Sequence, residues 1–113
     1  MSTTSATDRA LLLRHLAALR RAGVPAASGL RQVVSALPPG GLRDRLSAAA
    51  DALDRGESGE DLSDPLVAIV ARGEAAIPDV LEAAAASYEF EAATAELVGR
   101  AAGRLVLLLS VIG

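Results

Sequence analysis

His15 is the only histidine in this chain of 113 residues and the first residue to consider for catalysis or metal binding. The sequence has no cysteine and no lysine, so a zinc site built on cysteine or on several histidines is excluded. The lack of lysine also excludes the Gly-x-x-x-x-Gly-Lys loop that binds phosphates, and no Gly-x-Ser-x-Gly nucleophile elbow is present. His15 falls between the apolar positions of a predicted helix, so we expect a surface or boundary position and not a general base.

Acidic residues gather in one short segment, at Glu57, Glu60, Asp61 and Asp64. Carboxylates at such spacing could bind Ca²⁺ or Mg²⁺ weakly, but their order is not that of an EF-hand loop. We therefore favour a solvated loop, in which Ser58 and Asp61 could cap one short turn.

A second set of carboxylates, Glu82, Glu89 and Glu96, recurs every seven residues toward the C-terminal end. A catalytic carboxylate pair needs a cleft and a raised pKa, whereas this spacing by itself predicts only a shared helix face. We interpret the three residues as a solvated stripe. With no catalytic constellation and no metal-binding pattern, we expect a protein that is not an enzyme and uses no cofactor.

The elements that must position these residues are helices, as the composition indicates. Alanine occurs 25 times and leucine 18 times, whereas the chain has one phenylalanine, one tyrosine and no tryptophan. Alanine and leucine favour helices, while β-branched and aromatic residues favour strands. The length suits one small domain, and the net charge of −3 argues against a general nucleic-acid binder.

Capping residues divide the first half of the chain into three predicted helices. Ser5 and Asp8 have capping-box spacing before a helix over about residues 8–22, which Gly23 ends. Pro25 opens the second helix, because the missing N–H of proline is tolerated in a first turn. The Pro/Gly break at residues 38–41 precedes a third helix, which Gly56 caps.

Two further helices follow in the second half. Asp64 and Pro65 start a fourth helix that Gly73 stops. Pro78 starts the last helix, whose apolar spacing continues through Arg104 and into residues 105–112. We predict an all-α fold, namely an antiparallel bundle of five to six helices with short connections, whose last helix is long and runs toward a membrane.

The two ends of the chain differ in character. Residues 1–7 predict a flexible tail, and residues 8–104 form the predicted bundle. Residues 105–113 are almost entirely apolar, yet a membrane-spanning helix needs about 20 apolar residues. They are either the end of a buried apolar helix or, as we favour, the start of a truncated membrane span. Arg100 and Arg104 come just before them, and basic residues mark the cytoplasmic end of a span.

Several short motifs, spread over about residues 9–110, resemble those of a known family. The stretch Leu11–Pro25 resembles the opening L-x-R-x-L-A-x-L-x-x-A-G-V-P of the type II secretion system F domain, which also occurs in type IV pilus platform proteins. Further matches follow in the family's order: Leu42 and Leu46, Gly56-Glu57-Ser58, Ala71-Arg72-Gly73-Glu74, and Leu81 through Tyr88-Glu89. Two stretches depart from the pattern. Ala75–Pro78 replaces a Ser-Gly or Thr-Gly pair, and the segment between Gly56 and Pro65 is shorter than usual.

The resemblance implies a non-enzymatic role at the bacterial inner membrane. It implies a cytoplasmic domain of a platform protein for type II secretion, type IV pilus or Tad-like machines. Such a domain would contact an assembly ATPase and couple it to pilus or pseudopilus formation. Other platform components and a second copy of the chain are also implied as partners, with a membrane contact through residues 105–113 and no nucleic acid.

Individual residues carry predictions of their own, made from their types and positions. Gly23, Pro25, Gly56 and Gly73 are expected to shape the motifs. The predicted partner contacts are Arg20, Arg21, Arg72 and Glu74. For the three arginines, ordinary surface charges are the alternative. For the whole chain, the alternative function is a free-standing helical adaptor or regulator with no membrane link.

Overall fold

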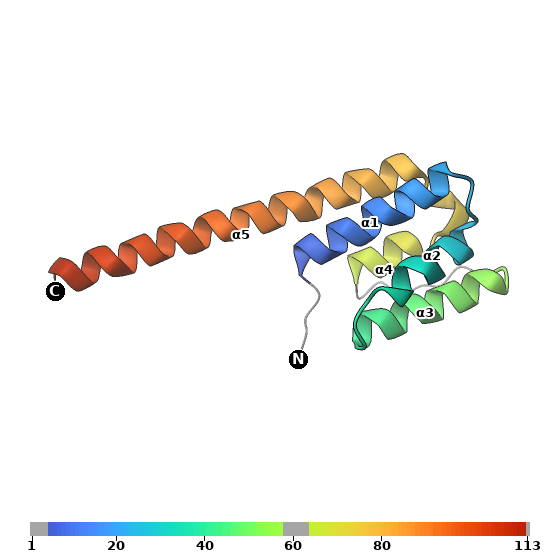
Figure 1. The fold of residues 1–113 in the computed structure, drawn as a ribbon, viewed down its shortest axis with the longest axis horizontal. Coiled ribbons are helices and arrows are strands. Elements are labelled where there is room, and N and C mark those ends of the chain that lie inside the picture. The colour runs from blue at the N-terminus through green and yellow to red at the C-terminus, as the bar shows by residue number, and fades with distance from the viewer. Residues whose placement is uncertain (1–4, 58–63, 113) are drawn as a thin grey trace.

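Residues 5–57 and 64–112 are described by the computed structural model, and over them the chain forms helices and no strand. Helix makes up 82% of the structure, which confirms the predicted all-α class. Five α-helices follow in order, with the 3₁₀ turn η1 (Gly73–Ala75) before the last (Figure 1): α1 (Ala6–Arg21), α2 (Ala26–Ser35), α3 (Gly41–Asp54), α4 (Pro65–Val70) and α5 (Pro78–Ile112). The predicted turn at Ser58 and Asp61, together with Glu60 and residues 1–4 of the predicted tail, lies outside the described residues.

Local capping chemistry sets where the helices begin. Ser5 Oγ accepts a hydrogen bond of 3.2 Å from the Asp8 N–H, and α1 begins directly after Ser5, two residues before the predicted start. Asp64 accepts a hydrogen bond of 2.9 Å from the Leu66 N–H at the start of α4, as predicted. Helix α2 begins one residue after Pro25, because Pro25 has an extended backbone (φ −57°, ψ 150°) and lies just outside the helix.

Glycines end α1 and α3, as the sequence predicts. Gly23 (φ +89°) and Gly56 (φ +73°) both adopt the left-handed conformation that glycine tolerates best. After α1, the Val24 N–H reaches back to the Leu19 carbonyl at 3.0 Å, and the equivalent bond after α3 measures 2.9 Å. This Schellman arrangement satisfies carbonyls that the end of a helix leaves without a donor.

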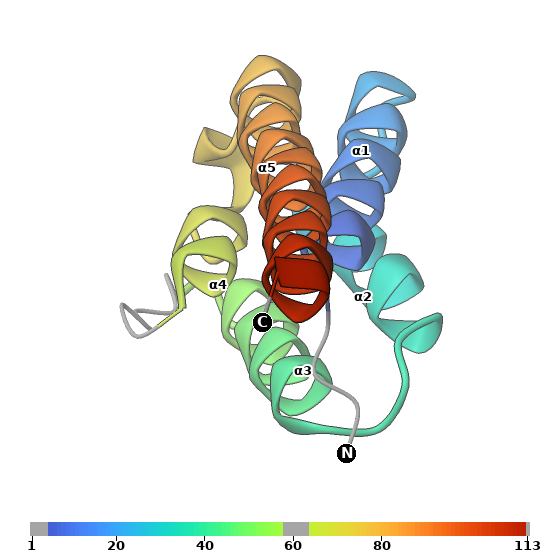
Figure 2. The same cartoon turned by 90° about the vertical axis from the view of Figure 1, so that its left-hand side faces the viewer.

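The core is built from leucine and alanine. Each of the five helices contributes a leucine that is at most 1% exposed: Leu13, Leu30, Leu46, Leu66 and Leu81. Burying one such side chain is worth about 1.5–3 kcal/mol, so these residues anchor the fold. Fully buried alanines allow close packing between the helices: Ala17, Ala50 and Ala85. Helix α5 packs mainly along α1, and Figure 2, which looks along α5, shows these two helices side by side.

Arginines on α1 and glutamates on α5 set an antiparallel register between these two helices. Arg14 of α1 pairs with Glu89 of α5. Seven residues later on α1, Arg21 pairs at 3.0 Å with Glu82, which lies seven residues before Glu89 on α5. Two of the three heptad glutamates therefore contact α1, while Glu96 pairs within α5. All of these side chains are 41–66% exposed. Exposed pairs contribute only about 0–1 kcal/mol each, so their main effect is on alignment.

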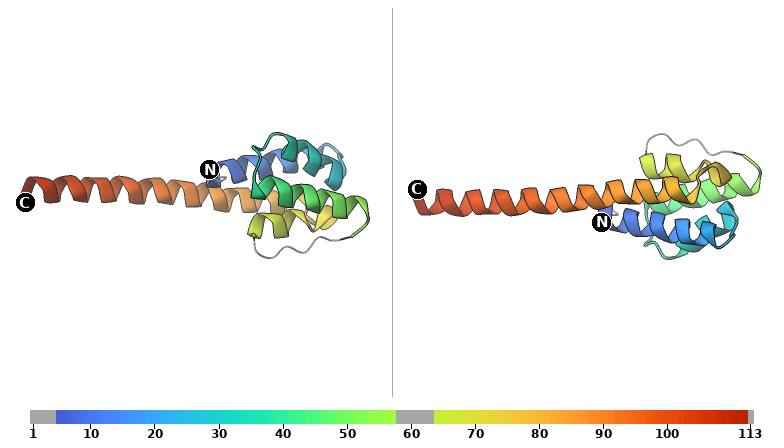
Figure 3. Two further views of the ribbon diagram at one scale, coloured as in Figure 1. Left: turned by 90° about the horizontal axis from the view of Figure 1, so that it is seen from below. Right: turned by 90° about the horizontal axis from the view of Figure 1, so that it is seen from above.

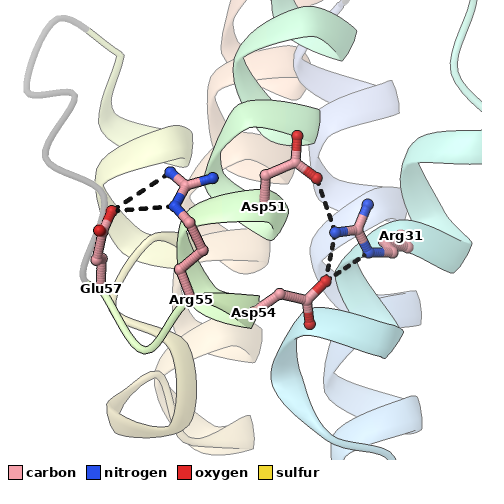
Figure 4. Close-up of polar contacts among 5 residues, drawn as sticks. All are labelled: Arg31, Asp51, Asp54, Arg55 and Glu57. Atoms are coloured by element: carbon pink, nitrogen blue, oxygen red, sulfur yellow. Dashed lines mark hydrogen bonds and ion pairs between the residues drawn. The ribbon is translucent and has the colours of Figure 1, made fainter.

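A similar arrangement joins α2 to α3. The Arg31 guanidinium lies between two carboxylates of α3, at 2.7 Å from Asp51 and also paired with Asp54 (Figure 4). The same view shows Arg55 paired with Glu57 at 3.3 Å, just after α3. The two pairs of Arg31 help to align the side of α3 that faces α2.

The most buried ion pair joins α1 to the start of α4. The two terminal nitrogens of Arg9 donate to the two oxygens of Asp64 at 2.7 and 2.9 Å, a bidentate contact. The Arg9 guanidinium also lies 5.8 Å from the ring centre of Tyr88 on α5, within range of a cation–π contact. The hydrogen bonds from Arg9, supported by the Leu66 N–H, hold the pKa of Asp64 below its usual range.

The end of α5 corrects the sequence prediction. Helix α5 extends well past the other helices (Figure 3), and every residue from 93 to 110 is exposed. In the described part of the chain, no helix is long and apolar enough to cross a membrane. The prediction of a bacterial inner-membrane location through residues 105–113 is therefore wrong. The physical reason is that the last 18 residues of α5, 95–112, include the charges of Glu96, Arg100 and Arg104.

Substitutions of Asp64 test the tie between α1 and α4. Asp64→Ala removes both the ion pair and the helix cap, so we expect the free energy of unfolding to fall by about 2–4 kcal/mol at neutral pH. Asp64→Asn keeps an oxygen for the Leu66 N–H and removes only the charge, so its loss should be smaller. Urea unfolding of both variants, followed by circular dichroism, measures the difference.

The same experiment has a defined dependence on pH. Because the native pKa of Asp64 is lowered, its stabilising effect is present above the unfolded-state pKa and is lost as the pH falls through the native pKa. The gap between wild type and Asp64→Asn should therefore close in acid, below about pH 4. A gap that stays constant with pH would contradict the role of the ion pair.

Candidate partner-binding site

The four predicted contact residues lie at one end of the molecule, opposite the free end of α5 (Figure 1). Here α1 finishes, α2 starts, and η1 leads into α5. Arg20 and Arg21 close α1, Arg72 precedes η1, and Glu74 lies within η1. We call this region the motif end and define it as residues 20–26 and 72–82.

Glu74 joins two of the sequence motifs that carry the resemblance. Its Oε1 accepts a hydrogen bond of 3.0 Å from the Ala26 N–H at the start of α2, and its Oε2 lies 2.5 Å from Arg20 Nη2. Arg20 Nη1 also donates to the Val24 carbonyl at 3.1 Å. Pro25 has no side chain that can cap α2, so Glu74 supplies the cap from a distant part of the chain.

The members of this ion pair differ in exposure. The Arg20 side chain is 15% exposed and the Glu74 side chain 69% exposed. The hydrogen bond from the Ala26 N–H, aided by the nearby Arg20 charge, holds the pKa of Glu74 below its usual range. Arg20 therefore acts within the fold, whereas the ionised carboxylate of Glu74 also presents an edge to solvent.

The two other predicted residues lie on the surface around this pair. Arg21 contacts the first turns of α5, at 2.7 Å from Asp79 and 3.0 Å from Glu82, and is half exposed. Arg72 is exposed beside η1. The structure thus brings Arg20 and Glu74 into direct contact, while Arg21 faces α5. A role of any of the four in binding a partner stays a prediction.

Sequence reasoning missed two apolar residues at the motif end. Ile77 is 50% exposed and Val80 38% exposed, directly after η1 and next to the charged Asp79. Val80 and Leu81 are adjacent apolar residues in the first turn of α5, but of the two only Leu81 is buried. The sequence could have indicated that Ile77 is exposed, because it is an isolated large apolar residue before Pro78 and belongs to no helical repeat. An apolar centre with charged residues around it is typical of protein–protein contacts.

The residues considered for chemistry lie apart from one another. His15 is exposed on α1. Of the acidic segment, Glu57 pairs with Arg55, and Asp64 pairs with Arg9. Within residues 5–57 and 64–112, no group of three or more histidine, aspartate or glutamate side chains could hold a metal ion.

Comparison with known protein families, curated proteins and solved structures finds no match for this chain. The resemblance to the type II secretion F domain therefore depends on the motif residues alone. In the structure, two of those motifs meet at the contact between Arg20 and Glu74.

Gly73 shapes the turn that carries Glu74. It is buried, with φ +64°, and a Cβ atom at this position would lie 2.7 Å from Leu53 Cδ2. Gly56 also has a positive φ, of +73°, but nothing lies within 4 Å of the equivalent Cβ position. The two glycines therefore separate the effect of backbone conformation from that of close packing.

Replacing each glycine by alanine measures these two effects. Gly56→Ala should lower the free energy of unfolding by about 1–2 kcal/mol, the cost of a left-handed conformation. Gly73→Ala should lose about 1–3 kcal/mol more, because the new methyl group collides with Leu53. Denaturant unfolding gives both values. Equal losses for the two variants, or no relief of the Gly73→Ala loss in a Leu53→Ala background, would contradict the close packing.

Proposed function

We propose that this chain is a non-enzymatic protein-binding domain that acts like the type II secretion F domain. Its partner would be a secretion or pilus assembly ATPase, and contact with this domain would couple the ATPase to assembly of a pilus or pseudopilus. In this proposal the helices of residues 8–104 form an antiparallel bundle, and the motif end is the surface that the partner contacts.

The observation that carries the proposal is the exposed apolar pair at the motif end. Ile77 and Val80 are large apolar side chains that are 50% and 38% exposed. Exposed charged residues of both signs lie close to them in the sequence, among them Arg72, Glu74 and Asp79. Apolar residues supply binding energy when they lose water, and the charged rim selects the partner.

The second support is the way in which the motif end is held. Glu74 fixes the start of α2 relative to η1, and Arg21 fixes the end of α1 relative to α5. Four chain segments are therefore tied together before any partner arrives. A preorganised surface loses little conformational entropy on binding, which favours affinity.

A binding assay with the purified assembly ATPase of the source organism tests this function. Ile77→Glu should raise the dissociation constant about tenfold or more, because a charge would be buried in the contact. Val80→Glu should act in the same direction. Isothermal titration calorimetry measures both, and thermal unfolding shows whether each variant is folded.

Phe90→Glu is the matched control. Phe90 is 74% exposed on α5 and lies outside the motif end, so this variant should bind as tightly as wild type. If all three variants bind the ATPase as tightly as wild type, the motif end is not part of the contact. No binding of the ATPase to wild type would refute the proposed coupling and favour the adaptor function.

A further inference from the structure

The free end of α5 carries an apolar surface that the rest of the described chain does not cover. Leu105, Val106, Leu107, Leu108 and Leu109 are 54–68% exposed. Five consecutive helical residues, about 100° apart, point around the whole circumference of a helix. The surface is therefore apolar on all sides. Soluble proteins rarely expose contiguous apolar patches of more than a few hundred Å² except where they bind something.

A second uncovered apolar surface lies between α1 and α2. These helices form a groove of about 290 Å³, lined by Leu11 and Leu12 of α1 and by Val33 and Leu37 from α2 and its C-terminal end. Leu12 and Val33 form its buried floor, whereas Leu11 is 62% exposed. Asp8 and His15 also line the groove, and both are exposed.

The two surfaces are complementary in charge as well as in hydrophobicity. Arg104 comes directly before the apolar residues of α5, and it is exposed. Asp8 is exposed at the edge of the apolar groove. We propose that the free end of α5 docks into the α1/α2 groove of a second copy of this chain, with Arg104 facing Asp8 of that copy.

The size of the groove and the position of Arg104 define how α5 would dock. A groove of about 290 Å³ is too small for a whole helix, but it has room for one or two apolar side chains. Leu107 and Leu108 lie three and four residues after Arg104, so they share its face of α5 and can enter the groove while Arg104 faces Asp8. The pairing is also between molecules, because α5 is one continuous helix that runs away from the body of its own chain (Figure 3).

This contact joins different surfaces of the two copies. The groove of the first copy and the free α5 end of the second copy both stay open in a dimer. Such a heterologous contact continues until a ring closes or a filament forms. The contact does not use the motif end, so the Ile77→Glu variant should self-associate like wild type.

Sedimentation velocity of the full chain over a range of concentrations tests the proposal. Wild type should form assemblies larger than a dimer. Leu11→Glu in the groove and Leu108→Glu on α5 should each raise the dissociation constant about a hundredfold, because either variant would bury a charge in an apolar contact. Both residues are exposed, so the variants should fold. Phe90→Glu is the exposed control and should associate like wild type.

Mixing the two variants gives a sharper result. Leu11→Glu keeps an intact α5 end, and Leu108→Glu keeps an intact groove, so one productive contact is possible between them. A mixture of the two monomers should therefore form a 1:1 dimer that grows no further.

Reversing the charges tests the contact between Arg104 and Asp8. Asp8→Arg and Arg104→Asp should each weaken association, and the double variant should recover it.

Three results would overturn the proposal. A wild type that stays monomeric at high concentration would show that a second copy does not cover α5. Assemblies that are lost in Leu108→Glu but unchanged in Leu11→Glu would indicate a symmetric contact between α5 helices. A mixture of the two variants that stays monomeric would exclude docking in the groove.

Discussion

The ion pair between Arg9 and Asp64 is the contact on which the arrangement of the helices depends. Helix α4 has six residues, too few to be stable without help from the rest of the fold. Asp64 caps α4 and binds Arg9 of α1 at the same time, while Arg9 also contacts Tyr88 of α5. One guanidinium therefore fixes three helices relative to one another. Both oxygens of the carboxylate are used, as a largely buried charge requires.

A second arginine repeats this arrangement at the other end of α1. Arg20 binds Glu74, and Glu74 caps the start of α2. Arg9 and Arg20 are eleven residues apart, about three helical turns, so they lie along one side of α1. Each binds a carboxylate that also caps the N-terminus of a short helix. Helix α1 is thus the frame of the domain, and the short helices are attached to it by charge as well as by apolar contact.

The sequence was a good guide wherever the deciding interaction is local. Ser5, Gly23, Gly56 and Asp64 mark helix ends through bonds to residues only a few positions away, so their types and spacing were sufficient. The all-α class followed from alanine and leucine content for the same reason.

Contacts between distant segments could not be predicted in this way. Arg9 and Asp64 are 55 positions apart, and Glu74 and Ala26 are 48 apart, so only the packing register of the helices brings them together. Arg20 was predicted to pair with acidic groups of a partner, yet its side chain is 15% exposed and pairs with Glu74 of its own chain. The end of α5 was misjudged because Arg100 and Arg104 were interpreted as flanking a span, whereas they lie with Glu96 within the last 18 residues of α5.

The continuous helix α5 has a mechanical consequence. Its 35 residues form a rod of about 52 Å, fixed to the body only over its first half. No proline interrupts it after Pro78, so it transmits rotation without a hinge. The free part, residues 93–112, is about 30 Å long, so a tilt of roughly 10° where it leaves the body would carry the tip sideways by about 5 Å, close to one helical turn. Small changes in the packing of α5 on α1 are thereby amplified at the tip of α5.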